Sequence, residues 1–230
     1  GAKIGSRHNA EGKIFLESNS LAVLSEAASG DRAHQCLDAV RKYLFSRFGV
    51  HLVWPTFTRP DDDIGYITRV YRGIKENGAI FSHPNPWAIV AECKLGRGDR
   101  AIKFYDALLP YHQNDLVEVR EAEPYSYCQF VMGKDHTAFG RARHPWLTGS
   151  AGWNYTAVTR WMLGIRLSFE GMVIDPCIPS DWKEFKVVRQ GWGATFNITV
   201  KNPHGVQKGV KSIALNGQPI HGSIPPQAAG

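Results

Sequence analysis

Two stretches of the chain repeat one order of apolar and polar residues. In each, a run rich in Ala, Leu, Ile and Val (residues 20–28 and 86–93) leads through a turn that contains Gly to the motif Gly-Asp-Arg-Ala (residues 30–33 and 98–101). Asp is favoured at helix starts. Each stretch therefore predicts an apolar helix followed by a second helix that begins near the Asp.

The second helix of the first pair is predicted over residues 31–48. Its apolar residues recur at helical spacing on one face, and Gly49 follows as the glycine that often ends a helix. A third apolar helix is predicted over residues 150–164. Apolar helices paired with amphipathic ones are typical of a toroid of inner and outer helices. The long segment 50–83 would then form a rim, where insertions commonly carry function.

Helical spacing fades after Ile165, and short runs of alternating apolar and polar residues take its place. Asn216-Gly217 is typical of a type I′ hairpin turn, and Pro225-Pro226 is expected to end the last strand. The predicted strands cover residues 186–189, 195–201 and 212–215.

The expected fold class is therefore mainly α with a β tail. We divide the chain into a helical part, residues 1–170, and a β part, residues 171–230. Two or three helix pairs do not close a ring, and three or four strands are few for an independent sandwich. The chain is thus expected to be the C-terminal part of something larger.

Charge and composition narrow the possible functions. Lys and Arg number 27 against 21 Asp and Glu, a formal net charge of +6, but the basic residues are interleaved with acids. We therefore expect no nucleic-acid partner. No apolar stretch approaches the roughly 18 residues that cross a bilayer, so no membrane partner is expected. The chain starts without a signal-peptide pattern and its four cysteines are widely spaced, which predicts a cytoplasmic protein with free thiols and no metal site.

Candidate chemistry begins near the end of the rim. Lys75 and His83 flank two glycines just before an apolar helix, where both could stand at the mouth of a toroid. The alternative is a solvated lysine and a helix-capping histidine. Further on, Thr148 is a good helix N-cap, and the small residues 149–152 would leave the first N–H groups of that helix open to an anion. An ordinary capped helix is the alternative there.

A third stretch, residues 118–129, mixes acids, tyrosines and a glutamine. Tyr125, Tyr127 and Gln129 would suit sugar hydroxyls through stacking and hydrogen bonds. The acids leave open a pair of carboxylates for glycoside hydrolysis, drawn from Glu118, Glu121 and Glu123. For Arg120 and Glu123 we expect instead an ion pair that supports the loop.

Taken together, these stretches resemble the C-terminal part of the cellobiose and chitobiose phosphorylases of glycoside hydrolase family 94. The resemblance implies the second half of an (α/α)6 barrel followed by part of a C-terminal β-sandwich domain. It also implies inverting phosphorolysis of a β-linked, cellobiose-type disaccharide to a sugar α-1-phosphate and a free sugar. Inorganic phosphate is then a co-substrate, and no cofactor is expected. The matching motifs, in order, are GIKENGAIFSHPNPW, GRGDRA, EPYSYCQ, HPWLTGSAGWN and IDPCIPSDW.

The resemblance also assigns roles to individual residues. It implies that His83, Gln129 and Thr148 donate hydrogen bonds to phosphate, with the Gly149 N–H beside them. A phosphorylase needs such a cradle because phosphate, already an anion, replaces the carboxylate that activates water in an inverting hydrolase. Lys75 matches a position that contacts the acceptor sugar.

The sequence departs from the family pattern at two points, one that affects the expected activity and one that affects the expected substrate. The family's general acid is an Asp in a Trp-Asn-Asp stretch, which this sequence lacks. We expect it upstream of Gly1 and assign no catalytic residue here. Tyr66 stands where cellobiose-specific members carry Glu, which argues against cellobiose as the substrate. The alternatives are chitobiose and an acidic acceptor such as cellobionate, which Arg69 or Arg72 would bind. A binding fragment without activity is the alternative function, and a homodimer is possible.

Overall fold

The computed structural model describes residues 2–147 and 149–227. Its helices are α1 (Leu16–Leu24), α2 (Gly30–Tyr43), α3 (Asn85–Lys94), α4 (Gly98–Leu108), α5 (Val117–Arg120) and α6 (Gly149–Thr156). Short helical turns are η1 (Tyr66–Arg69), η2 (Pro110–Leu116) and the π-helical η3 (Ala157–Met162), which continues α6.

The strands are short and all pair antiparallel. The strands of the first part are β1 (Ile14–Phe15), β2 (Phe45–Ser46), β3 (Gly49–Val50), β4 (Val53–Trp54), β5 (Ile80–Phe81), β6 (Cys128–Val131) and β7 (Ala142–Pro145). The strands of the tail are β8 (Ile165–Ser168), β9 (Gly171–Ile174), β10 (Glu184–Gly191), β11 (Ala194–Lys201), β12 (Ile213–Leu215) and β13 (Gln218–Ile220).

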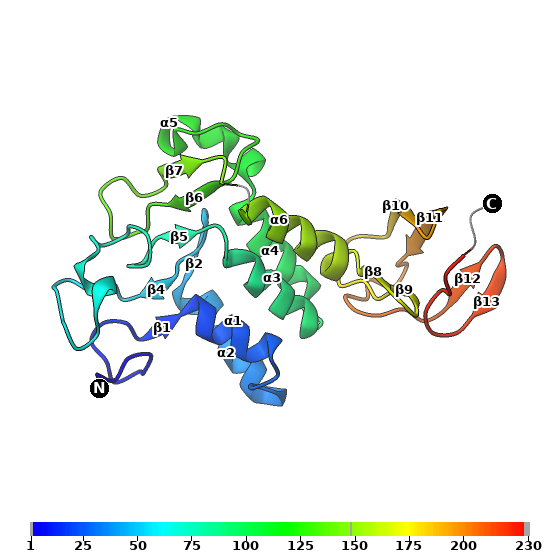
Figure 1. The fold of residues 1–230 in the computed structure, drawn as a ribbon, viewed down its shortest axis with the longest axis horizontal. Coiled ribbons are helices and arrows are strands. Elements are labelled where there is room, and N and C mark those ends of the chain that lie inside the picture. Colours follow the sequence, from blue (N-terminus) through cyan, green and yellow to red (C-terminus); the bar gives the residue numbers. More distant parts are fainter. Residues whose placement is uncertain (1, 148, 228–230) are drawn as a thin grey trace.

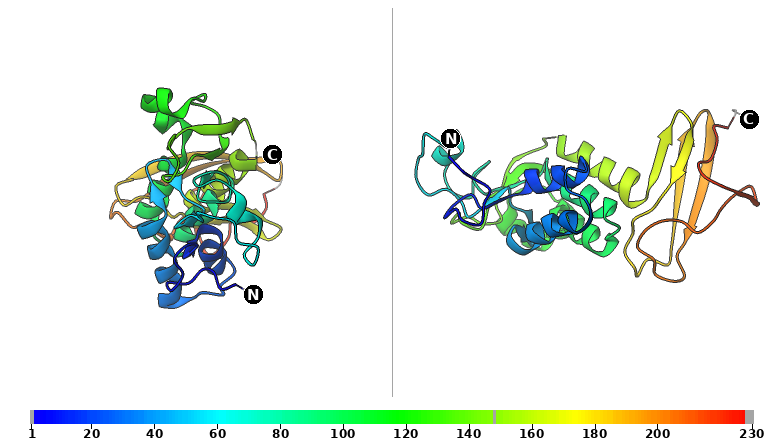
Figure 2. Two further views of the ribbon diagram at one scale, coloured as in Figure 1. Left: turned by 90° about the vertical axis from the view of Figure 1, so that its left-hand side faces the viewer. Right: turned by 90° about the horizontal axis from the view of Figure 1, so that it is seen from below.

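The predicted β tail is confirmed, but the part predicted to be helical also contains the short strands β1–β7, because its connecting segments pair with one another. The helices lie in the middle of the molecule, the small sheets β1–β4 and β5–β6–β7 lie on one side of them, and the tail strands lie on the other (Figure 1). The view from below in Figure 2 shows the tail set off at the end of the helical part. Among the described residues, no helix is both long and apolar enough to span a bilayer.

The helical core is built around α3. Eight of its ten residues are buried, because α1, α4, α6 and η3 all pack against it. In contrast, α2 and α4 each bury only one face, through residues such as Leu37 and Phe104. The predicted pairing of an apolar helix with an amphipathic one is therefore confirmed for α3 and α4, and both Gly-Asp-Arg-Ala motifs begin a helix. The third predicted apolar helix is present as α6 and η3.

Two predicted helix ends are wrong, and tertiary pairing explains both. The first helix starts at Leu16 rather than Ser20, because β1 pairs with β4 and the Leu16 N–H bonds the Leu52 carbonyl at 2.8 Å. The second helix ends at Tyr43 rather than at residue 48, because the chain turns into the β2–β3 hairpin. Gly49 is therefore part of a hairpin and not a helix stop. Its φ is +120°, and a Cβ there would lie 2.8 Å from Ile80 Cγ2.

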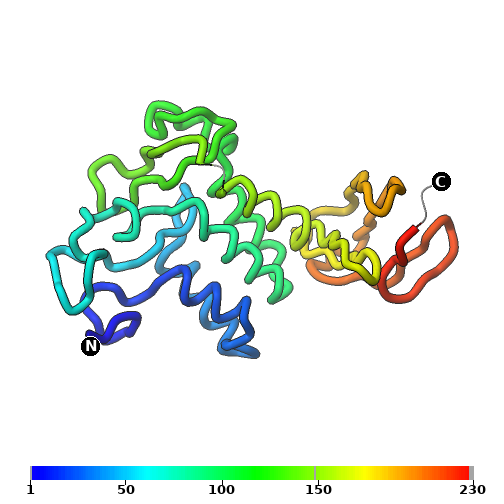
Figure 3. The backbone as a smooth tube through the Cα atoms, viewed as in Figure 1, coloured from blue at the N-terminus to red at the C-terminus, as the bar shows by residue number. Residues whose placement is uncertain are grey.

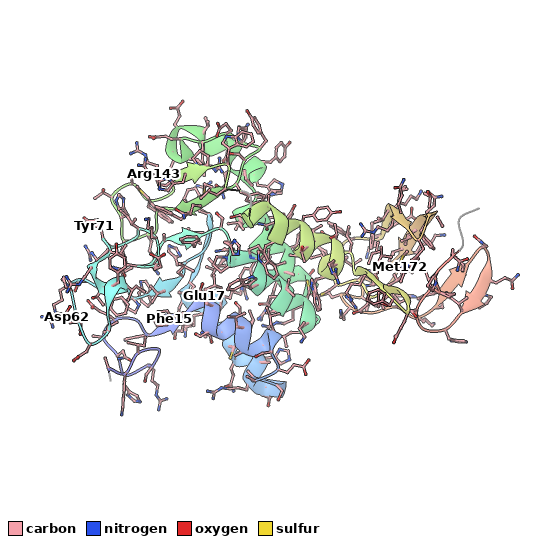
Figure 4. The ribbon with its side chains drawn as sticks, viewed as in Figure 1. Phe15, Glu17, Asp62, Tyr71, Arg143 and Met172 are labelled. Carbon is pink, nitrogen blue, oxygen red and sulfur yellow. The ribbon has the colours of Figure 1, made fainter. Side chains whose placement is uncertain are left out.

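The tail has its own small apolar cluster. Ile165, Met172, Phe196 and Ile224 are buried together, and Figure 4 labels Met172 at this cluster. The predicted type I′ turn is confirmed, since Asn216 and Gly217 join β12 to β13 with φ values of +50° and +82°. The prediction for Pro225-Pro226 is wrong, because β13 ends at Ile220.

The change from helix to sheet falls between η3 and β8. The predicted boundary at residues 170 and 171 lies within the turn of the β8–β9 hairpin. The division into residues 1–170 and 171–230 stays a prediction.

The second Gly-Asp-Arg-Ala motif attaches the tail to the helices. The Asp99 carboxylate accepts hydrogen bonds from the Ser180 N–H at 2.8 Å and from its hydroxyl at 3.0 Å. At Gly98 a Cβ would lie 2.0 Å from the Ile178 carbonyl oxygen, so only glycine allows this approach. In the first motif, nothing lies within 4 Å of the equivalent position on Gly30.

This difference predicts unequal effects of the same substitution in the two motifs. Asp99→Ala should lower the free energy of unfolding by about 1.5–3 kcal/mol, the usual contribution of hydrogen bonds to a charged group. Asp31→Ala, at the equivalent exposed position, should change it by less than about 0.5 kcal/mol. Urea unfolding of the two variants measures both values. Equal losses would contradict the role of Asp99 in docking the tail.

A buried histidine links the β2–β3 hairpin to a distant loop. His51 Nδ1 lies 2.7 Å from the Leu44 carbonyl oxygen, and His51 Nε2 accepts the Lys134 N–H at 3.1 Å. These partners fit the neutral ring with its proton on Nδ1. Burial lowers the pKa of His51 to about 4.

A pH-dependent loss of stability follows. The unfolded chain binds a proton at His51 below about pH 6.5, whereas the folded chain binds it only near pH 4. The free energy of unfolding therefore has its full value above pH 6.5. It falls by about 3 kcal/mol in total as the pH drops towards 4. Unfolding free energies measured between pH 4 and 7.5 should show a smaller slope for His51→Gln than for the unaltered chain. His34→Gln, on the exposed face of α2, should keep the original slope.

Candidate functional site

Three helix starts lie near one region of the helical part. Gly149, at the start of α6, lies against His83, just before α3. Glu17, in the first turn of α1, is near enough for the charge of His83 to lower its pKa. Helix starts carry unpaired N–H groups and partial positive charge, which favours anions. The region therefore has the polarity that a phosphate site needs.

A cavity of about 140 Å³ lies at this point, roughly the volume of four or five waters. Three of the residues predicted to bind phosphate, His83, Gln129 and Gly149, line it together. Thr148, the fourth, lies outside the described residues. The structure therefore brings together residues that are 66 positions apart in the sequence (149 − 83). The remaining lining residues are Phe81, Leu147 and Ser150.

Gly149 is needed for the close approach of α6 to His83. A Cβ on Gly149 would lie 2.8 Å from Nδ1 and 3.1 Å from Cε1 of the imidazole. Any side chain would therefore displace the ring, and glycine leaves the backbone N–H at the helix start uncovered. Because the predicted cap, Thr148, lies outside the described residues, the choice between an open helix start and an ordinary capped helix stays a prediction.

A buried amide places His83. Asn85 accepts the Val50 N–H at 2.7 Å, and it donates to the carbonyl oxygens of Val50 and Phe81 at 2.9 and 2.7 Å. It therefore ties the β2–β3 hairpin and strand β5 to the first residue of α3. His83 lies between the two tied points, Phe81 and Asn85, so its backbone has little freedom. The sequence shows this asparagine only as part of a motif, without its partners.

The rim is organised by a second buried amide. Asn77 accepts the Phe57 N–H at 2.8 Å and donates to the carbonyl oxygens of Phe57 and Val70 at 2.9 and 2.7 Å. Figure 3 shows the rim (cyan) running beside the segment that contains β6 and β7 (green). The rim is therefore a folded layer rather than a loose loop.

The two residues predicted to bind the acceptor sugar lie on this rim and do not line the cavity. Lys75 is exposed in a tight turn with a φ of +43°, and its carbonyl accepts the Ala79 N–H just before β5. Tyr66 begins η1 and is 77% exposed. It belongs to the outer loop that also carries Asp62 and Tyr71, at the end of the molecule away from the tail (Figure 4). The acceptor site therefore stays a prediction.

Glu17 is a candidate residue that the sequence analysis missed. It lies in the first turn of α1, as Figure 4 shows. Its side chain reaches solvent, yet partial burial raises its pKa, and the negative charge of Glu76 adds to the shift while His83 opposes it. A carboxylate thus stands near His83 and the rim. An acidic residue in the first turn of an otherwise apolar helix could have indicated a functional role. The predicted helix began three residues after Glu17 and so did not include it.

The acidic stretch does not form a pair of catalytic carboxylates. Glu121 is paired with Arg141. The Glu123 carboxylate accepts hydrogen bonds from its own backbone N–H and from Trp146 Nε1, and these bonds lower its pKa. A general acid needs a raised pKa instead. The predicted Arg120–Glu123 ion pair is wrong, since Arg120 donates instead to the backbone carbonyls of Glu123 and Ser126. The hydrolase interpretation therefore gains no support.

A larger cavity, of about 430 Å³, lies between α2 and α4 and contains none of the predicted site residues. Its charged residues have structural explanations. Asp38 is shared by Arg97 and Arg100, and Arg41 and Lys42 lie in the last turn of α2, where cations complement the helix dipole. We therefore place the site at the smaller cavity, where the chemistry converges.

Comparison with known proteins identifies the family of the chain. Over the whole chain, the sequence is 64% identical to an N,N′-diacetylchitobiose phosphorylase of Vibrio proteolyticus and 59% identical to one of Vibrio furnissii. It is 37% identical to a solabiose phosphorylase of Paenibacillus borealis over 98% of the chain. In each case the chain spans 29% of the relative's length. Residues 1–164 match the catalytic domain of the glycosyl hydrolase 94 superfamily, and the chain belongs to that family.

Proposed function

We propose that this chain is the phosphate-binding and acceptor-binding part of a disaccharide phosphorylase that acts on N,N′-diacetylchitobiose. The observation that carries this proposal is the meeting of His83, Gln129 and Gly149 around one small cavity at the start of α6. The two Vibrio relatives, at 64% and 59% identity, are both N,N′-diacetylchitobiose phosphorylases, so the expectation of a cellobiose substrate is not supported. A homodimer and a cytoplasmic location stay predictions.

The residues of the cavity suit an incoming phosphate. The imidazole of His83, the amide of Gln129 and the Gly149 N–H can all donate to phosphate oxygens. Held there, phosphate attacks the anomeric carbon of the donor sugar as the bond from that carbon to the glycosidic oxygen breaks on the opposite face. A general acid protonates the leaving oxygen, and inversion converts the β-linkage into an α-1-phosphate. The acid is expected from a Trp-Asn-Asp motif, which this sequence does not contain.

The arrangement of helices fits half of an (α/α)6 barrel. In this proposal, α1, α3 and the continuous α6 and η3 are inner helices, and α2 and α4 are outer helices. The starts of the inner helices then face the substrate. Residues 171–230 would belong to a C-terminal β-sandwich domain.

Two carboxylates near His83 favour a neutral acceptor sugar over an acidic one. Of the two arginines considered for an acidic acceptor, Arg69 is paired with Asp62 and Arg72 is exposed. The negative charge of Glu76 raises the pKa of Glu17, so the two carboxylates lie close enough to interact. Carboxylates at this position would repel a cellobionate-type acceptor and accept hydrogen bonds from the hydroxyls of a neutral sugar.

The reaction can be tested with a protein of the relatives' full length that carries this sequence. With N,N′-diacetylchitobiose and inorganic phosphate, it should release N-acetylglucosamine α-1-phosphate and N-acetylglucosamine in equal amounts, which phosphorus NMR can follow. The 230-residue chain alone should release none, because it lacks the acid motif. Cleavage that proceeds equally without phosphate would indicate a hydrolase and overturn the proposal.

His83 and Gln129 should act on phosphate in that full-length protein. His83→Ala and Gln129→Ala should each raise the phosphate KM by about ten- to a hundredfold, since a charge-assisted hydrogen bond is lost. Steady-state kinetics at varied phosphate concentration measures the change, and His34→Ala on α2 serves as the control. A lower melting temperature with normal phosphate kinetics would mean that the two residues are only structural.

Lys75 should act on the acceptor sugar alone. In the synthetic direction, Lys75→Ala should raise the KM for N-acetylglucosamine by about ten- to a hundredfold and leave the KM for the sugar 1-phosphate nearly unchanged. Lys103→Ala, an exposed lysine on α4, is the matched control. If Lys75→Ala and Tyr66→Glu both leave every acceptor unaffected, the rim does not form the acceptor site.

A further inference from the structure

The His83 ring is enclosed by two indole rings. Trp87, from the first turn of α3, has its ring centroid 6.0 Å from that of His83, with an angle of 88° between the planes. Trp153, from α6, lies at 6.4 Å and 70°. The two indoles also contact each other, at 5.9 Å and 78°. Three aromatic rings, two from the start of α3 and one from α6, therefore form one edge-to-face cluster at the edge of the cavity.

The Nδ1 edge of the imidazole faces backbone. Its Nδ1 and Cε1 lie against Gly149, where a Cβ would come within 2.8 and 3.1 Å. Gly149 and Trp153 are four residues apart in α6, so both lie on one face of that helix. A single helix therefore supplies both the glycine that admits the ring and a tryptophan that packs against it.

Aromatic packing of this kind restrains the orientation of an imidazole. Perpendicular rings place the positive edge of one against the negative face of another, which fixes the ring's orientation. A fixed orientation favours binding of an anion in the cavity. The contacts do not depend on hydrogen bonds of the indole, since Trp87 Nε1 is buried and has no acceptor among the described residues.

We propose that Trp87 and Trp153 are positioning residues that hold His83 in the orientation in which it binds phosphate. The inference rests on the proposed phosphate site and adds to it two residues that do not line the cavity. It requires the aromatic face of each tryptophan but not its N–H. A phenylalanine should therefore replace either tryptophan, and an aliphatic side chain of similar size should not.

A double-mutant cycle in the full-length protein tests the proposal. Trp153→Met should raise the phosphate KM by about two- to tenfold, the range expected for one aromatic pair, with little change in the KM for the disaccharide. Trp153→Phe should keep the phosphate KM close to its original value. In a His83→Ala background, Trp153→Met should have no further effect, because the tryptophan acts through the histidine. Trp192→Met is the matched control, since Trp192 packs edge-to-face on Phe196 at 6.0 Å in the tail.

The outcomes separate this inference from the proposed function. If His83→Ala raises the phosphate KM but Trp153→Met does not, or if Trp153→Met has the same effect with and without His83, the positioning role is wrong and the phosphate site stands. If His83→Ala leaves the phosphate KM unchanged, the site and the inference both fail. Melting temperatures are measured for each variant. Should Trp153→Met fold poorly, Trp87→Met removes the other contact and is subject to the same cycle.

Discussion

The arrangement of the site depends on the hydrogen bonds of one buried side chain, Asn85. Its amide uses both its oxygen and its nitrogen on the backbone of Val50 and Phe81, so three segments meet at the first residue of α3. A buried amide without partners would be strongly unfavourable, which makes this arrangement specific. Gly49 leaves room for this amide, since a Cβ at that position would lie 3.0 Å from Asn85 Oδ1. His83 is positioned as a result.

The polar groups of the protein divide into two kinds. Glu92 and Arg97 form a buried pair that Asp38 joins from α2, and this pair holds helices together. Burial raises the pKa of Glu92, and the hydrogen bond from Arg97 opposes the shift. Around the small cavity, by contrast, the described structure orients His83 by aromatic packing and a backbone approach. This leaves the polar atoms of the site for a ligand, whereas Glu92 Oε2 and Arg97 Nε are bonded to each other.

Sequence periodicity was a good guide to the helices but a poor one to their ends. It placed α3, α4 and the continuous α6 and η3 correctly, because a buried or one-sided helix must repeat its apolar residues every three or four positions. It misplaced the start of α1 and the end of α2. The start of α1 is decided by contact with a distant segment at Leu52, and the end of α2 by the β2–β3 hairpin, in which Phe45 pairs with Val50. Helical periodicity reveals neither. The same limit explains Glu17, which was missed because the helix that carries it was begun too late.

The motif Gly-Asp-Arg-Ala shows most directly what each level of structure determined. The sequence alone determined that both copies begin a helix, because Asp favours helix starts wherever it occurs. The sequence also determined the chemical types at the site and their family. Only the tertiary structure decided that Gly98 and Asp99 receive the β tail, while nothing packs close to Gly30 and Asp31 faces solvent. The same four residues differ in role because close approach and hydrogen bonding depend on which distant segment lies opposite, and that is a property of the whole fold.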